Sequence, residues 1–446
     1  MVEISFEIYY NIFVKVLQGS SKNMVKINDI YTVEITDTNI FGNGICHIDG
    51  FVVFVCGALA GEKCEIKITD ARKNFAYAEV ISFISKSKER VVPTCPVYSM
   101  CGGCSLLHTS IEKENEIKEN YLNSIFKKNG IDINIEKITT PVYEKYRNKV
   151  VFYYKNGKHG YMANGTNDVV LHSKCTLNED AFDEIATLTG NHFGDKIRAL
   201  YIRKSSELNE IMVCPVLREG VDMLGYVSTL VLEYPSVKTV LCSVYKEKDF
   251  ALEKAKFKVV YGDGYITDTL CGLNFRISPS SFYQVNPICA EKLYEKAIEL
   301  ASLSGNDTCA DLFCGTGTIG IICAKKTGAT VYGVEINEDA IKDAKFNAKL
   351  NGIKNISFEA TDAKNFNKSV DVAIIDPPRK GCMPIMLETL LRLKPKRIVY
   401  VSCNAETLAR DLKTLLNEYQ IASPLYPYNM FPRTSHVETV VCLSRK

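Results

Sequence analysis

Residues 29–84 alternate apolar and polar positions over short runs that glycines interrupt. Alternation of this kind is typical of half-buried β-strands, and Asp49-Gly50 predicts a tight hairpin turn. The expected strands read YTVEIT, GICHI, FVVFV, CEIKIT and AYAEVISFI. Short strands joined by tight turns predict a small β-barrel, to which we assign residues 24–84.

Two more patterns divide the rest of the chain. Residues 85–270 mix strands such as NKVVFYY and IRALYIRKS with one helix expected near 179–190, which predicts a central α+β domain. Residues 271–446 instead alternate strands with helices. The expected strands there are TCADLF, TVYGVEI, ISFEAT, VDVAIID and RIVYVS, and the expected helices are 317–326, 338–351, 384–393 and 405–418. This order predicts an α/β fold, a doubly wound, Rossmann-like parallel sheet.

Length and composition agree with a three-domain globular protein. The 446 residues exceed what one hydrophobic core holds, and no apolar run reaches the roughly 18 residues that a membrane-spanning helix needs. We therefore expect no membrane contact. The 17 cysteines stand mostly singly in apolar stretches, and no convincing signal peptide is seen, so we expect a reducing cytoplasm. Residues 1–23 form an uncertain extension, with Met24 as an alternative start, and we assume a monomer.

The 54 Lys and Arg residues nearly balance the 52 Asp and Glu residues, so any nucleic-acid binding must come from local patches. One such patch lies around the last strands of the expected barrel: Lys63, Lys67, Arg72, Lys73, Lys86, Lys88 and Arg90. Barrels of the oligonucleotide-binding type use such faces to bind nucleic acid. A solvated basic edge that prevents strand aggregation explains the charge equally well.

The segment DLFCGTGTIG, residues 311–320, places an apolar strand before three glycines and a helix after them. This arrangement lets backbone amides approach a ligand at a helix N-terminus, although a tight strand–helix turn would look the same. Glu335 ends the next strand, where a carboxylate can accept the two ribose hydroxyls of an adenosine-type ligand. Asp376 begins DPPRKG at the carboxyl end of the fourth strand, at the edge where such sheets bind ligands.

Cys403 follows the fifth strand at the same edge, with a helix directly behind it, and we expect the helix dipole to lower its pKa. A cysteine at such an edge can act as a nucleophile toward a bound ligand, because its thiolate adds readily to an electrophilic carbon. A carboxylate nearby can accept a proton in the same reaction, and Glu438 in HVETVV is our candidate base. Either residue alone would more often be structural, since cysteines are commonly buried and edge strands commonly charged.

These residues resemble those of the RNA uridine-5-methyltransferases that act on ribosomal and transfer RNA. The likeness covers roughly residues 29–446 and rests on SFYQVN (281–286), DLFCGTG (311–317), DPPRKG (376–381), VSCN (401–404) and HVE (436–438). It implies a nucleophilic Cys403, a basic Glu438 and S-adenosylmethionine as methyl donor. The implied donor contacts are Gln284, Phe313, Glu335, Asp362 and Asp376, although the family often has Asn in place of Asp362. The N-terminal barrel resembles the TRAM module of RNA-modifying enzymes, which favours RNA as the partner.

Cys95, Cys101 and Cys104 leave five and then two residues between their thiols, a spacing that lets a loop wrap one metal centre. The spacing alone leaves zinc and iron–sulfur open. The resemblance implies a [4Fe–4S] cluster whose fourth ligand is Cys175, with a structural or RNA-positioning role.

Three alternatives accompany this interpretation. The RNA is expected to be ribosomal, 23S ribosomal RNA above all, because the cluster and the barrel occur in ribosomal members, and transfer RNA is the alternative. A non-catalytic RNA-binding or assembly protein would keep the fold, but the intact Cys403 and Glu438 speak against it. An amino-methyltransferase acting on adenine or glutamine would carry an aromatic residue after the prolines, where this chain has Arg379.

Overall fold

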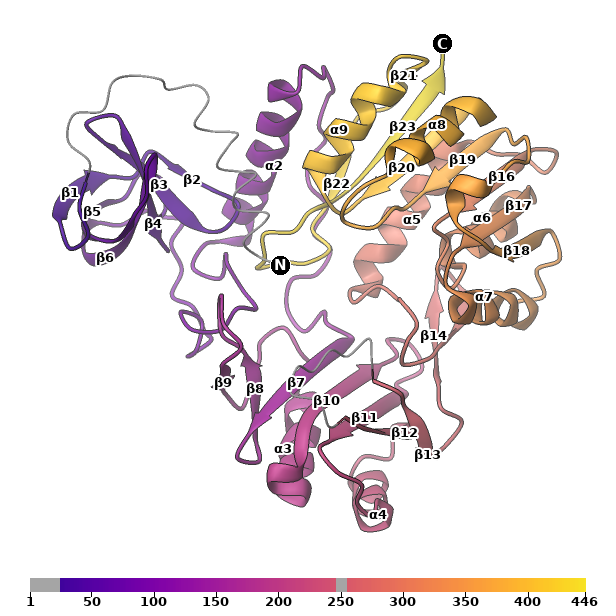
Figure 1. The fold of residues 1–446 in the computed structure, drawn as a ribbon, viewed down its shortest axis with the longest axis horizontal. Coiled ribbons are helices and arrows are strands. Elements are labelled where there is room, and N and C mark those ends of the chain that lie inside the picture. Colours follow the sequence, from indigo (N-terminus) through magenta and orange to yellow (C-terminus); the bar gives the residue numbers. More distant parts are fainter. Residues whose placement is uncertain (1–24, 246–254) are drawn as a thin grey trace. The chain divides into compact units, whose positions relative to one another are not determined.

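The computed structural model describes residues 25–245 and 255–446, so the extension proposed for residues 1–23 lies outside the described residues. The chain divides into two compact units (Figure 1). The first comprises Met1–Tyr121, Met162–Asp168 and Arg433–Ser435, and the second comprises Leu122–Tyr161, Val169–Pro432 and His436–Lys446. No described helix is long and apolar enough to cross a membrane.

The first unit contains the predicted barrel as a six-stranded sheet in the order β1-β5-β6-β4-β3-β2. Its strands are β1 (Ile30–Glu34), β2 (Asp37–Thr38), β3 (Asn43–Ile48), β4 (Phe51–Cys56), β5 (Lys63–Ala71) and β6 (Phe75–Ser85). Alternate residues of β5, among them Cys64, Ile66 and Ile68, are fully buried, as period-two patterning requires. One residue of the basic patch is structural: Arg90 pairs with the buried Glu62 at 2.6 Å.

A long helix, α2 (Ile111–Lys128), follows the barrel and was not among the predicted elements. Its sequence, IEKENEIKENYLNSIFKK, is mostly polar. Within the first unit its buried Glu114 pairs with Lys118 at 2.8 Å and accepts the backbone amide of Arg433 at 2.9 Å. A buried charged residue held by such contacts packs as part of the core, which the alternation of apolar residues does not reveal.

The central part of the second unit is a seven-stranded sheet in the order β13-β12-β11-β10-β7-β8-β9. Its strands are β7 (Lys149–Lys155), β8 (Lys158–Met162), β9 (Val169–Leu171), β10 (Ile197–Lys204), β11 (Ile211–Leu217), β12 (Val237–Val244) and β13 (Lys258–Tyr261). The predicted helix is α3 (Asp180–Phe193), and a second helix, α4 (Leu224–Glu233), lies beside it. Residues Val150 and Phe152 pack with both helices, whereas Val151 packs on the opposite face against the C-terminal domain.

The hairpin of β14 (Ile266–Leu270) and β15 (Leu273–Ile277) leads into the C-terminal sheet, whose order is β18-β17-β16-β19-β20-β23-β21, with β22 paired to β23. Its strands are β16 (Thr308–Leu312), β17 (Thr330–Glu335), β18 (Ile356–Ala360), β19 (Val372–Ile375), β20 (Arg397–Ser402), β21 (Tyr419–Ile421), β22 (Tyr426–Tyr428) and β23 (Glu438–Arg445). The first five are parallel, and β23 is antiparallel to β20.

The helices of this domain are α5 (Pro287–Ala301), α6 (Thr318–Thr327), α7 (Glu338–Leu350), α8 (Pro384–Leu393) and α9 (Ala405–Leu415). α6 and α7 join strands that progress one way from β16, whereas α8 and α9 join strands that progress the other way (Figure 1). Right-handed crossovers therefore put the two pairs on opposite faces of the sheet. The strand order reverses between β16 and β19, and the predicted doubly wound fold is confirmed. Such a switch point is where open α/β sheets bind ligands.

Candidate active site

The expected site residues of the second unit gather at one edge of the C-terminal sheet. Phe313, Glu335, Asp376 and Cys403 stand at or just beyond the carboxyl ends of the parallel strands β16, β17, β19 and β20. Glu438 begins the antiparallel β23, which pairs Ser402 with Thr439, so its start lies at the same edge as Cys403. Sheet geometry alone therefore brings the expected nucleophile, the expected base and the glycine loop to a common crevice.

The glycine loop after β16 has a backbone that few other residues could adopt. Phe313, Gly315 and Gly317 have φ values of 68°, 54° and 80°. A Cβ atom at Gly317 would lie 2.8 Å from the ring of Phe358, so glycine is required there for space as well as for conformation. Gly317 begins α6 without a side-chain cap, which leaves the helix N-terminus open toward a ligand.

Two carboxylates hold this loop. Glu335 accepts the backbone N–H of Gly315 at 3.3 Å through one oxygen and that of Asn337 at 2.9 Å through the other. Asp311 is buried below the loop and accepts the N–H of Gly320 at 2.8 Å, while burial raises its pKa to about 7. Asp311 thus supports the loop from inside, and Glu335 stands at its rim, where a ribose would lie.

The two remaining expected donor contacts occupy different surroundings. Asp362 begins a short 3-10 turn, Ala363–Asn365, and pairs with Lys364 at 2.9 Å, a contact that lowers its pKa. Gln284 is buried in the loop before α5, and its backbone carbonyl accepts the side-chain N–H of Asn148 at 3.1 Å. Phe282, two residues earlier, is 66% exposed. The loop therefore turns one side chain inward and one outward, and the donor contacts stay predictions.

The expectation of a lowered pKa for Cys403 is wrong for the ligand-free protein. Burial raises the pKa of Cys403 to about 12, the negative charges of Glu438 and Asp376 add to the rise, and Arg379 opposes it. The helix end is also already satisfied, because the side chain of Asn404 accepts the N–H groups of Glu406 and Thr407 at 3.0 and 3.4 Å. The cap formed by Asn404 and the burial of the thiol together outweigh the effect of the helix dipole on the pKa of Cys403.

Glu438 is 6% exposed, and burial raises its pKa to about 8; the nearby charge of Asp376 adds to the rise, and Arg379 opposes it. Asp376 keeps some contact with solvent, but the protein around its carboxyl group raises the pKa to about 7. A pKa near 7 is suited to a group that accepts and releases a proton during catalysis. The site thus holds a partly buried thiol beside two carboxyl groups whose pKa values lie near neutral pH.

Arg379 counteracts this negative charge from a loop that is firmly held. Its guanidinium contacts His436 Nδ1 at 3.1 Å, and its carbonyl accepts the side-chain N–H of Asn404 at 3.3 Å. Two residues on, Gly381 has a φ of 71°, and a Cβ there would lie 2.6 Å from the guanidinium of Arg410, which donates to the carbonyl of Lys380 at 3.0 Å. The helix behind Cys403 therefore fixes the loop that carries Arg379.

Sequence reasoning missed Tyr294 of α5. Its buried hydroxyl lies beside the side chains of Thr318 and Gln284 and within the field of Asp376 and Glu438, and burial raises its pKa well above the ordinary range. Along the sequence Tyr294 shares its helix face with Leu293 and Ala297, a pattern that indicates burial only. Nothing in the pattern could have placed a hydroxyl group at the floor of this site.

The four expected cluster cysteines belong to different units: Cys95, Cys101 and Cys104 to the first, and Cys175 to the second. All four are partly exposed, and Cys101 Sγ accepts the N–H of Gly103 at 3.4 Å. Within the described ranges, no three His, Cys, Asp or Glu side chains stand close enough to hold a metal ion. The geometry of the described chain therefore does not itself support a metal centre.

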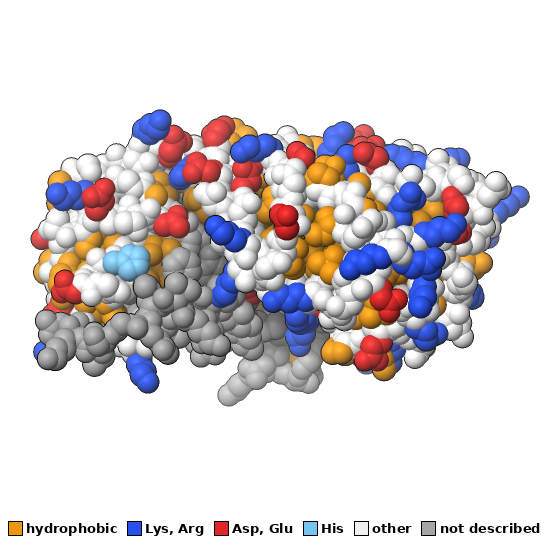
Figure 2. Space-filling view, turned by 90° about the horizontal axis from the view of Figure 1, so that it is seen from above, with side chains coloured by type: hydrophobic (Ala, Val, Ile, Leu, Met, Phe, Trp, Pro, Cys, Tyr) orange, Lys and Arg blue, Asp and Glu red, His pale blue; other side chains and the backbone are white. Residues whose placement is uncertain are grey.

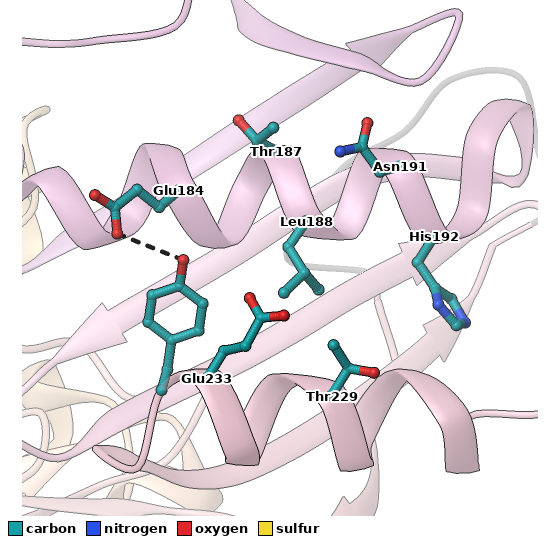
Figure 3. A pocket seen from close by; sticks show the side chains of 8 residues that line it. Glu184, Thr187, Leu188, Asn191, His192, Thr229 and Glu233 are labelled. Carbon is teal, nitrogen blue, oxygen red and sulfur yellow. Dashed lines mark hydrogen bonds between the residues drawn. The ribbon is translucent and has the colours of Figure 1, made fainter.

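A groove between α3 and α4 lies on another face of the second unit (Figure 3). Its lining residues are Glu184, Thr187, Leu188, Asn191, His192, Thr229, Glu233 and Tyr234. These helices cover the face of the central sheet opposite to the one that packs on the C-terminal domain. The groove is thus separate from the carboxyl edge, and it brings together no nucleophile and base.

Charge is mixed on the face of the molecule that Figure 2 shows. Figure 2 shows Lys and Arg side chains interspersed with acidic and hydrophobic ones rather than gathered in one field, in keeping with a formal net charge of +2. A polyanion such as a nucleic acid would therefore be attracted by local groups of Lys and Arg side chains rather than by the net charge of the protein.

Comparisons with known proteins agree with this site. A family model described as tRNA (Uracil-5-)-methyltransferase matches residues 250–446, and a TRAM domain model matches residues 25–81. An uncharacterized RNA methyltransferase of Listeria innocua is 36% identical over 454 residues, covering 95% of this chain and 99% of the relative. One of Clostridium acetobutylicum is 34% identical over 455 residues, with 94% and 98% covered.

Among solved structures, the Pyrococcus abyssi tRNA (uracil-54, C5)-methyltransferase in complex with S-adenosyl-L-homocysteine aligns with a TM-score of 0.74 and 26% identity. The alignment covers 93% of this chain and 100% of that one. Fold, glycine loop and these likenesses together define an S-adenosylmethionine-dependent methyltransferase. More narrowly, the chain belongs to the tRNA (uracil-5-)-methyltransferase-like family of RNA methyltransferases that carry a TRAM domain.

Proposed function

We propose that this enzyme methylates carbon 5 of a uridine in structured RNA, with Cys403 as nucleophile and Glu438 as base. The observation that carries the proposal is the meeting of a thiol and a buried carboxyl group at the carboxyl edge of the parallel sheet, beside Asp376 and the glycine loop. The target base would be flipped out of its stack to reach this crevice. Phe282, which is 66% exposed, offers a face on which it can stack.

The chemistry follows from the weakness of uracil as a carbon nucleophile. The Cys403 thiolate adds to carbon 6, and the electron pair of the 5,6 double bond moves into an enolate. Carbon 5 then takes the methyl group from the sulfonium of S-adenosylmethionine, which leaves as S-adenosylhomocysteine. Glu438 accepts the hydrogen of carbon 5 as a proton, and the electrons of that bond restore the double bond as the thiolate leaves. The thiol of Cys403, which is partly exposed, must first lose its own proton to solvent water, and the positive charge of Arg379 favours that loss.

Trapping the covalent intermediate tests both roles at once. Glu438→Gln, incubated with unmethylated RNA and S-adenosylmethionine, should accumulate a protein–RNA adduct that survives denaturing electrophoresis, because addition and methyl transfer precede proton removal. The matched control is the double variant Glu438→Gln/Cys403→Ala, which should form none. Slow release through water is compatible with the mechanism. Wild-type turnover by Glu438→Gln without an adduct would assign the base to another group.

We further propose ribosomal RNA, 23S above all, as the substrate, with transfer RNA as the alternative that the likeness to the Pyrococcus abyssi enzyme supports. The TRAM domain fits either RNA. The decisive experiment maps 5-methyluridine in both RNAs from cells with and without the gene. Loss of the modification from transfer RNA alone would exclude the ribosomal assignment.

A [4Fe–4S] cluster on Cys95, Cys101, Cys104 and Cys175 is also proposed. Its support is the spacing of the thiols in the sequence and the amide-to-sulfur contact at Cys101. Anaerobically purified protein should contain about four iron and four sulfide per chain. Cys175→Ser should lower both, whereas Cys56→Ser, which removes an exposed cysteine of the barrel, should not. Iron-free or zinc-containing protein would reject the cluster.

A further inference from the structure

A group of cations stands behind the loop that carries Phe282 and Gln284. Lys149 begins β7 and lies directly opposite Arg203 of β10 in the sheet. Both side chains lie on the face of the central sheet that also bears Val151 and Tyr201, which pack against the catalytic domain. Arg147, two residues before Lys149, adds a third positive charge close by.

The position of these cations relative to the catalytic loop is fixed by hydrogen bonds within the second unit. Arg203 donates to the carbonyls of Tyr283 at 2.8 Å and Ser281 at 3.3 Å. Asn148, next to Lys149, donates its backbone N–H to Val285 at 3.0 Å and its side-chain N–H to Gln284 at 3.1 Å. The central sheet thus holds residues 281–285 along their length, with Lys149 beside them.

Neither Arg203 nor Lys149 has an anionic partner within the described residues. Arg203 is fully buried, its contacts are carbonyl oxygens, and its Nε has no hydrogen-bond partner. Within the described residues Lys149 makes no ion pair, and its pKa is lowered to about 8 by burial and by the charges of Arg203 and Arg147. A half-buried ammonium among other cations is costly unless an anion binds there.

We propose that Lys149, supported by Arg203 and Arg147, binds a backbone phosphate of the substrate RNA next to the methylated uridine. The inference rests on the proposed function, because it requires an RNA whose target base enters beside Phe282. A phosphodiester matches the site in charge, and it remains partly solvated, as the half-buried ammonium does. Arg203 and Arg147 contribute their field, and Lys149 supplies the direct contact.

Kinetics with RNA from cells that lack the gene test the proposal, with tritiated S-adenosylmethionine as donor. Lys149→Gln should lower kcat/KM for RNA roughly tenfold or more, because it removes a charge-assisted hydrogen bond. It should also reduce the slope of log kcat/KM against log salt by about 0.7 to 0.9, the value of one phosphate contact. Lys149→Arg should retain most activity. The matched control Lys155→Gln removes an exposed charge at the other end of β7 and should behave as wild type.

The possible results distinguish a contact with RNA phosphate from a contact with the methyl donor. Wild-type RNA kinetics and salt slope in Lys149→Gln overturn the phosphate contact. Weakened binding of S-adenosylmethionine in calorimetry, with the salt slope unchanged, overturns it in favour of a contact with the donor's carboxylate. If Lys149→Gln melts early, Lys149→Met keeps the apolar stem and repeats the comparison. Absence of 5-methyluridine after treatment with the wild-type enzyme refutes the proposed function instead.

Discussion

Replacing the expected base should stabilise the folded protein, and increasingly so as pH rises. Glu438 is 6% exposed, and burial raises its pKa from 4.5 to about 8. A group whose pKa is higher in the folded state contributes stability that is complete below its unfolded pKa and is lost as pH rises through the folded pKa. Ionisation of Glu438 therefore lowers the free energy of unfolding of the wild type between about pH 4.5 and about pH 8. Glu438→Gln has no group that ionises there, so it lacks this pH dependence.

The size of the effect follows from that shift. Each pKa unit corresponds to about 1.4 kcal/mol, so the full shift amounts to roughly 5 kcal/mol. Because the unfolded carboxyl group begins to ionise near its ordinary pKa, we expect the advantage of Glu438→Gln to grow by about 3 kcal/mol between pH 5 and pH 8. For a protein of this size the gain is on the order of 5 °C in Tm.

Thermal melting of wild type and Glu438→Gln at both pH values, without donor or RNA, measures this difference. Glu359→Gln is the matched control, because that carboxylate is exposed on β18 and its removal should leave the pH dependence unchanged. Equal pH dependence in wild type and Glu438→Gln would show that Glu438 is not a buried carboxyl group with a raised pKa.

Three other outcomes are expected. Cys403→Ser should abolish methyl transfer in the tritium assay but leave the Kd for S-adenosylmethionine in calorimetry nearly unchanged, since the thiol faces the base; full turnover would contradict the mechanism. Affinity for the cationic donor should rise between pH 6 and pH 8 as Asp376, with a pKa of about 7, becomes a carboxylate, and Asp376→Asn should flatten this dependence in the same titration. Gly333→Ala should lower Tm through a loss of about 1 to 3 kcal/mol, because its Cβ would lie 2.4 Å from the ring of Phe358; an unchanged Tm would show that the ring moves freely.

The sequence predicts the barrel and the doubly wound sheet because both rest on simple periodicities. Strand positions alternate in the barrel, and strands and helices alternate in the C-terminal domain. α4 was missed for local reasons: its sequence LGYVSTLVLE contains three β-branched residues, and it begins without a side-chain cap. α2 was missed because buried ion pairs rather than an apolar stripe hold its first turns.

Much of the candidate site could also be predicted, since residues at the carboxyl ends of neighbouring parallel strands share one edge. What the sequence could not supply is the environment of each group. The sign of the Cys403 pKa shift depends on burial and on carboxylates that arrive from β19 and β23, and these outweigh the helix directly behind the thiol. Tyr294 likewise enters the site only through the packing of α5.

The charge of the methyl donor changes during the reaction, and this change affects the pKa values of the carboxyl groups in the site. Burial and the charge of Asp376 make ionisation of Glu438 costly, and Arg379 relieves this cost only in part. A sulfonium donor brings a positive charge that favours their ionised forms, whereas the thioether product has lost it. In the proposed mechanism, methyl transfer therefore increases the proton affinity of Glu438 at the step at which carbon 5 gives up its hydrogen. A base whose strength rises when the sulfonium disappears couples proton removal to completed transfer, which a solvent-exposed carboxylate could not do.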